Sequence, residues 1–181
     1  MKHPASPSEC IQRLEVMLRA GSNAVKLSRD QIDYMNQCPT SSVTILLKQL
    51  LGSEDLFLES RAFDGLMNLS GFDHVGFLCS ELTTSGHKDW KAVYCERLAS
   101  FQDPRVIPAL CQILEYDEDP DVRFVAAEQL GEIGDVTVIR PLERAASLDH
   151  GEDFEGRLVS DAAQEAIRAI RSRVERNQRN G

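Results

Sequence analysis

Apolar residues recur along this chain at a constant step. The clearest column is a leucine, present as Leu14, Leu46, Leu78, Leu110 and Leu142. Neighbouring leucines are about 32 residues apart, a period typical of repeat proteins, and we call this separation the repeat step. Around the three central leucines, apolar residues occur at i, i+3, i+4 and i+7, as in Val43, Leu46, Leu47 and Leu50. This spacing places them on one face of an α-helix, so the pattern predicts a first helix in every repeat, with one buried face.

A second apolar set follows each first one, at i, i+4, i+8 and i+11. The three sets begin at Leu58, Trp90 and Val122, which are again one repeat step apart. Each repeat is therefore predicted to be a pair of helices. Because neither helix can bury its apolar face alone, consecutive pairs must stack, and we expect an all-α solenoid with a continuous core.

Capping residues mark where several of these helices begin. Asp103 and Asp119 each precede a proline, which is typical of an N-cap followed by the first helical residue. Ser28 and Gln31 have the spacing of a capping box. We expect the first helices of the pairs near residues 8–20, 41–51, 73–84, 104–116 and 136–148. We expect the second helices near residues 29–38, 54–70, 87–101, 120–133 and 158–174.

These helices define one repeat domain over residues 8–174, between a disordered segment at residues 1–7 and a basic tail at residues 175–181. Its units are expected at residues 8–38, 39–71, 72–102, 103–134 and 135–174. In the last unit the second-helix column appears five residues late, which indicates an insertion between Leu148 and Arg157. This acidic stretch is either a solvated loop or part of a binding face, since insertions in solenoids collect on one face.

The charge is unevenly distributed along the chain. The formal net charge is −9, but residues 1–167 carry 15 Lys and Arg against 28 Asp and Glu, whereas residues 168–181 are basic. An acidic body repels phosphates, so nucleic acid is not expected as a partner. The arginines of residues 168–181 are expected on a solvated, fraying helix end, namely Arg168, Arg171, Arg173, Arg176 and Arg179. Because no apolar stretch has the length of a signal sequence or a membrane span, we expect a cytoplasmic protein with no membrane partner.

The cysteines show neither a metal-binding nor a disulfide pattern. There are five of them, an odd number with no Cys-x-x-Cys, namely Cys10, Cys38, Cys79, Cys95 and Cys111. This arrangement argues against a disulfide framework. Cys79 and Cys111 share the column of Leu47, so they are expected to be small buried apolar residues in a reducing compartment.

Residues 103–143 carry a specific set of short motifs. These are Asp-Pro, Pro-x-Leu, Asp-x-x-Val-Arg and Ala-Ala-x-x-Leu-Gly-x-Ile-Gly, whereas residues 39–101 keep only the apolar columns. The segment resembles the bacterial HEAT-like repeats first associated with phycobilisome bilin lyases. The resemblance implies a right-handed α-solenoid superhelix of about five helix pairs. Proteins of this kind are mostly binding scaffolds, although some are lyase subunits that handle bilins and some act in toxin immunity, so the resemblance leaves the function open.

Carboxylates recur on the exposed side of the second helices. Once the insertion is counted they keep the same repeat step, as Asp64, Glu96, Glu128 and Glu165. Glu132 and Asp161 lie one helical turn away. Stacked helices are about 8 to 10 Å apart, which is too wide for two carboxylates to share a metal ion or a proton. These six residues are the predicted binding site for a basic protein; the alternative is an ordinary solvated face.

The sequence contains no recognisable catalytic arrangement. The four histidines, His3, His74, His87 and His150, have no partner at metal-site or triad spacing. Phosphate-binding glycine loops and nucleophile motifs are also missing. We therefore expect no enzyme activity, no metal and no cofactor. The aromatic residues with core spacing, Trp90, Tyr94 and Phe101, are expected to pack inside the protein, although an aromatic wall could also contact a tetrapyrrole.

Three functions follow from these patterns. The first is a non-enzymatic scaffold or adaptor whose acidic concave face binds a basic protein, an immunity-type role included. The alternative is a bilin lyase or chaperone-type subunit that acts on a tetrapyrrole or its carrier protein. A third is an assembly factor whose exposed ends pair with another solenoid.

Overall fold

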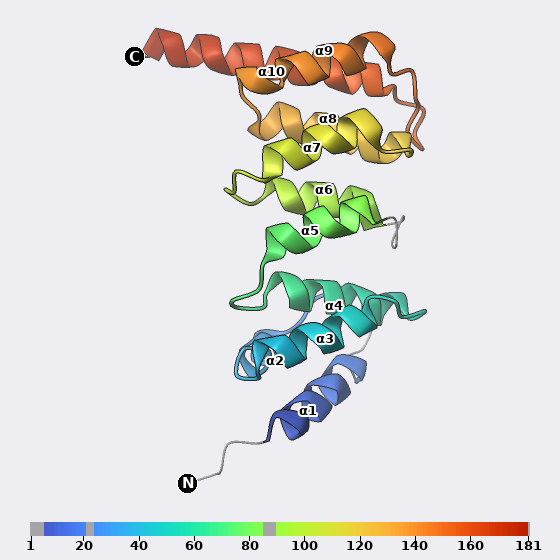
Figure 1. Cartoon of the computed structure of the whole chain (residues 1–181), viewed down its shortest axis with the longest axis vertical. Helices are drawn as coiled ribbons and strands as arrows, with labels where there is room; N and C mark the ends of the chain where they lie inside the picture. Colours follow the sequence, from blue (N-terminus) through green and yellow to red (C-terminus); the bar gives the residue numbers. More distant parts are fainter. Residues whose placement is uncertain (1–5, 21–23, 85–89, 181) are drawn as a thin grey trace. The chain divides into compact units, whose positions relative to one another are not determined.

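The computed structural model of the chain describes residues 6–20, 24–84 and 90–180. Its regular elements in these ranges are ten α-helices, one short 3-10 helix and one isolated β-bridge (Figure 1). The all-α fold expected from the repeats is therefore confirmed. The chain divides into two compact units, Met1–His74 and Val75–Gly181, and each is described separately below. The single domain over residues 8–174 stays a prediction.

The first unit contains four helices at the expected places. They are α1 (Pro7–Arg19), α2 (Arg29–Met35), α3 (Thr40–Leu50) and α4 (Leu56–Met67). The predicted capping box is present, because the Ser28 hydroxyl accepts the Gln31 amide hydrogen and the Gln31 side chain accepts that of Ser28. A second capping box joins Ser6 and Glu9, so the part of the 1–7 segment that the structure describes caps and begins α1. The leucine column is buried in this unit.

A disulfide bond joins the first turn of α1 to the turn that follows α2. The Sγ atoms of Cys10 and Cys38 are 2.07 Å apart, and the two residues are separated by 28 positions. The expectation that the cysteines form no disulfide is therefore wrong for this pair. The odd number of cysteines gave no indication of this bond, because the pairing depends on how α1 and α2 fold against each other. Cys79 and Cys111 are half-buried rather than buried.

The second unit begins within α5 and contains three stacked helix pairs. Its helices are α5 (His74–Thr83), α6 (Lys91–Ala99), α7 (Val106–Tyr116), α8 (Pro120–Ile133), α9 (Ile139–Leu148), which follows the 3-10 helix η2 (Val136–Val138), and α10 (Val159–Asn180). The predicted start of α6 at residue 87, with His87, lies outside the described residues, as does His3. The second helices α6, α8 and α10 pack on one another in sequence.

The core of the second unit contains the predicted apolar columns. Leu78, Leu110 and Leu142 have no exposed surface. Tyr94 is only 1% exposed, and its ring stacks on that of Trp90 with centroids 6.2 Å apart. Tyr94 therefore belongs to the packed interior, whereas Trp90 and Phe101 are half-buried. In the part of the chain that the structure describes, no helix has the length and apolar character needed to span a membrane.

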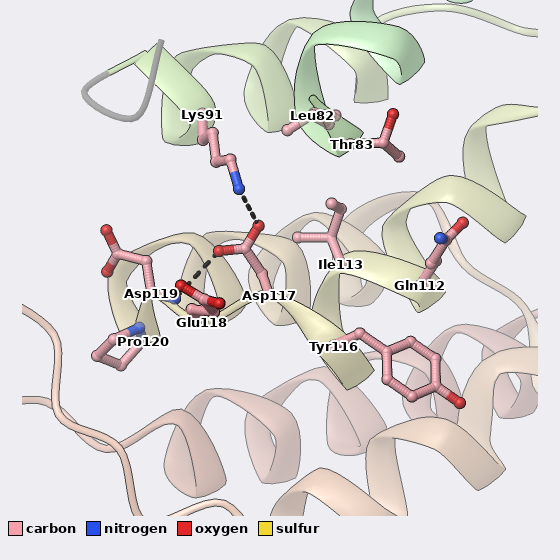
Figure 2. Close-up of a pocket in the computed structure, with 10 residues that line it drawn as sticks. All are labelled: Leu82, Thr83, Lys91, Gln112, Ile113, Tyr116, Asp117, Glu118, Asp119 and Pro120. Atoms are coloured by element: carbon pink, nitrogen blue, oxygen red, sulfur yellow. Dashed lines mark hydrogen bonds and ion pairs between the residues drawn. The ribbon is translucent and has the colours of Figure 1, made fainter. Parts of the chain in front are cut away.

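Two equivalent ion pairs connect successive repeats in the second unit. The Nζ of Lys91 lies 2.7 Å from the Asp117 carboxylate (Figure 2). One repeat later, the Nε of Arg123 lies 2.7 Å from the Asp149 carboxylate. The two cations are one repeat step apart, and so are the two acids, so the period that places the leucines also places these charges. The hydrogen bond from Arg123 lowers the pKa of Asp149 below its ordinary value.

The basic end of α10 is a continuous helix that also supports α8. The helix runs to Asn180 instead of ending near residue 174. The Arg173 guanidinium donates hydrogen bonds to the carbonyl oxygens of Gly131 at 3.1 Å and Glu132 at 3.0 Å, at the end of α8. A cation at this position satisfies unpaired carbonyl groups and interacts favourably with the helix dipole. The expectation of a solvated arginine is therefore wrong for Arg173.

Candidate functional site: an acidic hollow between α8, α10 and the inserted loop

Three of the predicted acidic residues surround one hollow in the second unit. The hollow has a volume of about 420 Å³, and the carboxylates on its wall are Glu128 of α8 and Asp161 and Glu165 of α10. All three are exposed. Glu132 is also exposed, one turn along α8 from Glu128. The packing of α8 against α10 thus brings together carboxylates that are far apart in the sequence.

Several carboxylates surround Glu128. Partial burial of its carboxyl raises the pKa above the ordinary value, and the neighbouring carboxylates of Glu132, Asp153 and Glu165 raise it further. The Arg157 guanidinium acts in the opposite direction. The negative charge on Glu128 is therefore destabilised in the free protein, and an added cation beside it would relieve that unfavourable interaction.

The inserted loop forms the third wall of the hollow. The Arg157 guanidinium lies 4.2 Å from the centroid of the Phe124 ring, on α8. Its Nε also donates to Asp153 at 2.7 Å. Asp153 is itself buried and accepts the amide hydrogens of Glu155 and Arg157. The loop is thus an ordered structure held by its own hydrogen bonds and by α8, rather than only a solvated connection.

A close approach between the loop and α8 explains one glycine in it. A Cβ atom on Gly151 would lie 2.6 Å from Arg123 Nη2 and 2.9 Å from Pro120 Cβ. The Phe154 amide donates a hydrogen bond to Asp121 at 2.6 Å, while the Phe154 side chain is 82% exposed. The five-residue shift of the repeat predicted this insertion and was the sequence signal for Arg157, at its end. Nothing in the sequence pointed to Phe124 as part of the site, because its place there depends on how the loop packs on α8.

The two remaining predicted residues have different surroundings. Glu96 is exposed on α6, which packs against α8. Asp64 is half-buried in the first unit, where its Oδ2 accepts the Leu27 amide hydrogen at 2.8 Å. Asp64 therefore has a structural role in holding the segment before α2. Partner binding by Glu96 and Asp64 stays a prediction.

The hollow combines three exposed carboxylates with the Arg157 guanidinium and with the side chains of Phe124, Leu158 and Ala162. Within the described ranges, no three His, Cys, Asp or Glu residues are grouped so as to hold a metal ion. Cys95 is buried, and burial raises the pKa of its thiol to about 12, so this thiol is a poor nucleophile at neutral pH.

Comparison with known proteins identifies the repeat type. A family model described as HEAT repeats matches residues 75–171, which is more than half of the chain. No curated protein and no solved structure matches the chain significantly. The finer resemblance to bilin-lyase repeats stays a prediction. The matched segment contains both inter-repeat ion pairs and the acidic hollow, and the chain belongs to the HEAT repeat family.

Proposed function

We propose that this chain is a non-enzymatic protein-binding scaffold that docks a basic protein through the acidic hollow between α8, α10 and the inserted loop. HEAT repeats commonly serve as protein-interaction scaffolds. The observation that carries the proposal is the convergence of Glu128, Asp161 and Glu165 on one hollow. A lysine or arginine of the partner enters it and forms charge-assisted hydrogen bonds with these carboxylates.

The electrostatics of Glu128 support a cationic occupant. Because its pKa is raised in the free protein, its ionised form gains more from a nearby cation than an ordinary surface glutamate would. The Arg157 guanidinium already lies over the Phe124 ring, 4.2 Å from its centroid. Because Phe124 is buried and already in contact with Arg157, the partner's cation is expected to meet the carboxylates rather than this ring. An immunity-type role, in which the partner is a cationic toxin, is a specific form of this proposal.

The disulfide bond bears on the cellular compartment of this protein. The cytoplasm stays a prediction for this chain. The disulfide between Cys10 and Cys38 argues against a strongly reducing compartment, because such bonds persist mainly in oxidising environments.

The proposal is tested with charge reversals that are matched in net charge. The variant Glu128→Lys/Glu165→Lys changes the hollow, while Glu54→Lys/Glu175→Lys changes two exposed acids elsewhere by the same amount. The probe is a fluorescein-labelled peptide of alternating lysine and glycine, and the measurement is fluorescence anisotropy. We expect the first variant to bind at least about ten-fold more weakly than the second.

Two results would contradict the proposal. Equal losses in the two variants would mean that the peptide senses only the net charge of the protein. Unchanged binding in the Glu128→Lys/Glu165→Lys variant would place the peptide elsewhere. Circular dichroism spectra that match the unmodified protein control for folding, which exposed positions are expected to preserve.

A further inference from the structure

The second unit has two more hollows, at the end where its first helices finish. One has a volume of about 610 Å³ and lies between the ends of α5 and α7 and the starts of α6 and α8 (Figure 2). The other, of about 370 Å³, lies between α7, α9 and the start of α8. Tyr116 and Asp117 line both hollows. We call them the α5–α7 groove and the α7–α9 groove.

The two grooves are equivalent positions of successive repeats. The ion pair of Lys91 with Asp117 lines the first, and the ion pair of Arg123 with Asp149 lines the second. The residues that line the α7–α9 groove therefore correspond to those that line the α5–α7 groove, one repeat step earlier in the chain. Stacked helices lie about 8 to 10 Å apart, so the centres of the grooves are separated by roughly one such distance.

Each groove has a large apolar side chain exposed at its edge. Tyr116, at the end of α7, and Leu148, at the end of α9, are both 70% exposed and are one repeat step apart. A single exposed leucine or tyrosine is ordinary on a protein surface. Two that recur at the same repeat position, each beside a hollow, form an extended apolar edge, which is a feature of interaction sites.

The charges of the two grooves differ. In the α7–α9 groove the charged groups are paired, since Arg144 contacts Glu115 and Arg123 contacts Asp149. In the α5–α7 groove Lys91 neutralises Asp117, but Glu118 and Asp119 add further negative charge. The first groove is thus acidic, whereas the charges of the second are paired and its exposed edge at Leu148 is apolar.

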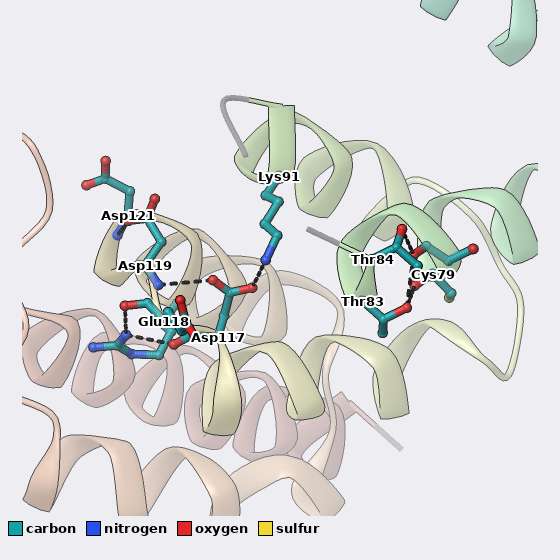
Figure 3. Close-up of polar contacts among 10 residues, drawn as sticks. Cys79, Thr83, Thr84, Lys91, Asp117, Glu118, Asp119 and Asp121 are labelled. Atoms are coloured by element: carbon teal, nitrogen blue, oxygen red, sulfur yellow. Dashed lines mark hydrogen bonds and ion pairs between the residues drawn. The ribbon is translucent and has the colours of Figure 1, made fainter. Parts of the chain in front are cut away.

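Hydrogen bonds between side chains and backbone groups hold the acidic rim of the α5–α7 groove in place. This rim consists of Asp117, Glu118 and Asp119. Asp117 accepts the amide hydrogen of Asp119 at 3.0 Å, and Asp119 accepts that of Asp121 at 2.9 Å (Figure 3). Arg123 donates to the carbonyl oxygens of Asp117 at 2.8 Å and Glu118 at 3.1 Å. A rim that is already ordered loses little conformational entropy when a ligand binds.

We propose that these two grooves bind one extended segment of a partner protein, with a lysine or arginine in the α5–α7 groove and a large apolar side chain in the α7–α9 groove. The cation meets Glu118 and Asp119. Tyr116 points away from these two acids (Figure 2) and lines both grooves, so it contacts the segment between its two anchor residues. The apolar side chain packs on Leu148. An extended chain advances about 3.3 Å per residue, so the distance between the grooves corresponds to a spacing of about three residues.

This surface is separate from the hollow at Glu128 and goes beyond the function proposed above. The grooves are lined by the ends of first helices, whereas the acidic hollow is lined by α8, α10 and the inserted loop. The two sites share no lining residue among those described. If no peptide binds in the grooves, the function proposed for the acidic hollow is therefore not contradicted, and the reverse also holds.

The test uses a defined peptide and the full chain. The probe is a short peptide of glycine and serine that contains one arginine and, three positions later, one leucine. Titration is followed by amide chemical shifts in two-dimensional NMR. We expect saturable shifts around Tyr116 and Leu148, and at least about ten-fold weaker binding by Tyr116→Ser and by Leu148→Ser. Both side chains are exposed, so neither serine is expected to impair folding.

Two controls make the result specific. A peptide in which arginine and leucine are adjacent is expected to bind at least about ten-fold more weakly, because it cannot reach both grooves. The Glu128→Lys/Glu165→Lys variant is expected to bind the original peptide with unchanged affinity. The proposal is wrong if no saturable shift appears up to about 5 mM peptide. It is also wrong if the shifts occur at Glu128, or if spacing has no effect.

Discussion

Replacement of Gly131 by alanine is a sharp test of how α8 and α10 pack. A Cβ atom at this position would lie 2.8 Å from the Cα and 2.9 Å from the Cβ of Ala166 on α10. Real Cβ atoms essentially never approach other atoms this closely, and the first obstacle is backbone. Since a backbone atom cannot rotate aside, α10 must shift away from α8. The shift weakens contacts of neighbouring buried residues such as Leu130 and Ala163.

Two opposing effects determine the size of the change. Alanine is more favourable than glycine inside a helix by about 1 kcal/mol. Overpacking of a well-packed interface costs about 1 to 3 kcal/mol, and the higher part of this range applies when backbone must move. We therefore expect Gly131→Ala to reduce the free energy of unfolding by about 1 to 2 kcal/mol.

Gly65 in α4 provides the matched control. A Cβ atom there would lie 3.1 Å and 3.2 Å from the two Cδ atoms of Leu47, which are the ends of a flexible side chain. Leu47 is buried but needs to move by only a few tenths of an ångström, so this cost offsets part of the helix-propensity gain of about 1 kcal/mol, and Gly65→Ala is expected to be less destabilising than Gly131→Ala. Urea denaturation followed by circular dichroism gives the stability, and native-state hydrogen exchange assigns any loss to α8 and α10. A Gly131→Ala variant as stable as the unmodified protein would refute the close packing.

Three further predictions concern the core, the ion pairs and the disulfide. Leu110→Ala, at a fully buried position of the repeat column, should lower the free energy of unfolding by about 2 to 5 kcal/mol in urea denaturation; a loss below about 1 kcal/mol would contradict its place in the core. Asp149→Asn weakens the ion pair with Arg123 and should lower stability by about 1.5 to 3 kcal/mol at neutral pH. Because the pKa of Asp149 is lowered in the folded state, its contribution is complete above the ordinary value of 3.8 and is lost as pH falls through the folded pKa. The difference between this variant and the unmodified protein should therefore shrink at acid pH, and a constant difference down to about pH 2 would contradict the pairing. Reduction of the Cys10–Cys38 bond should lower stability by about 3 to 4 kcal/mol, since it frees a loop with a sequence separation of 28; hydrogen exchange in α1 that is unaffected by reductant would argue against the bond.

The sequence was most informative about features that repeat locally. The leucine column predicted where the first helices lie, because helical periodicity depends on residues three and four positions apart. Ser28 and Gln31 similarly predicted the start of α2, because a capping box is formed by residues within one turn. The shift of the last repeat located the insertion to within a few residues. The family match over residues 75–171 agrees with this interpretation.

The remaining features depend on contacts between residues far apart in the chain. The Cys10–Cys38 bond requires α1 to fold against α2, and the support of α8 by Arg173 requires α10 to place a guanidinium at the end of α8. The same is true of the acidic hollow: the column predicted Glu128 and Glu165, but only tertiary packing added Arg157 from the inserted loop. A repeat sequence thus determines by itself which faces are buried, because burial follows a local period. The tertiary structure decided which side chains meet between helices, because these contacts depend on the distance between the helices and on their relative position along the helix axes.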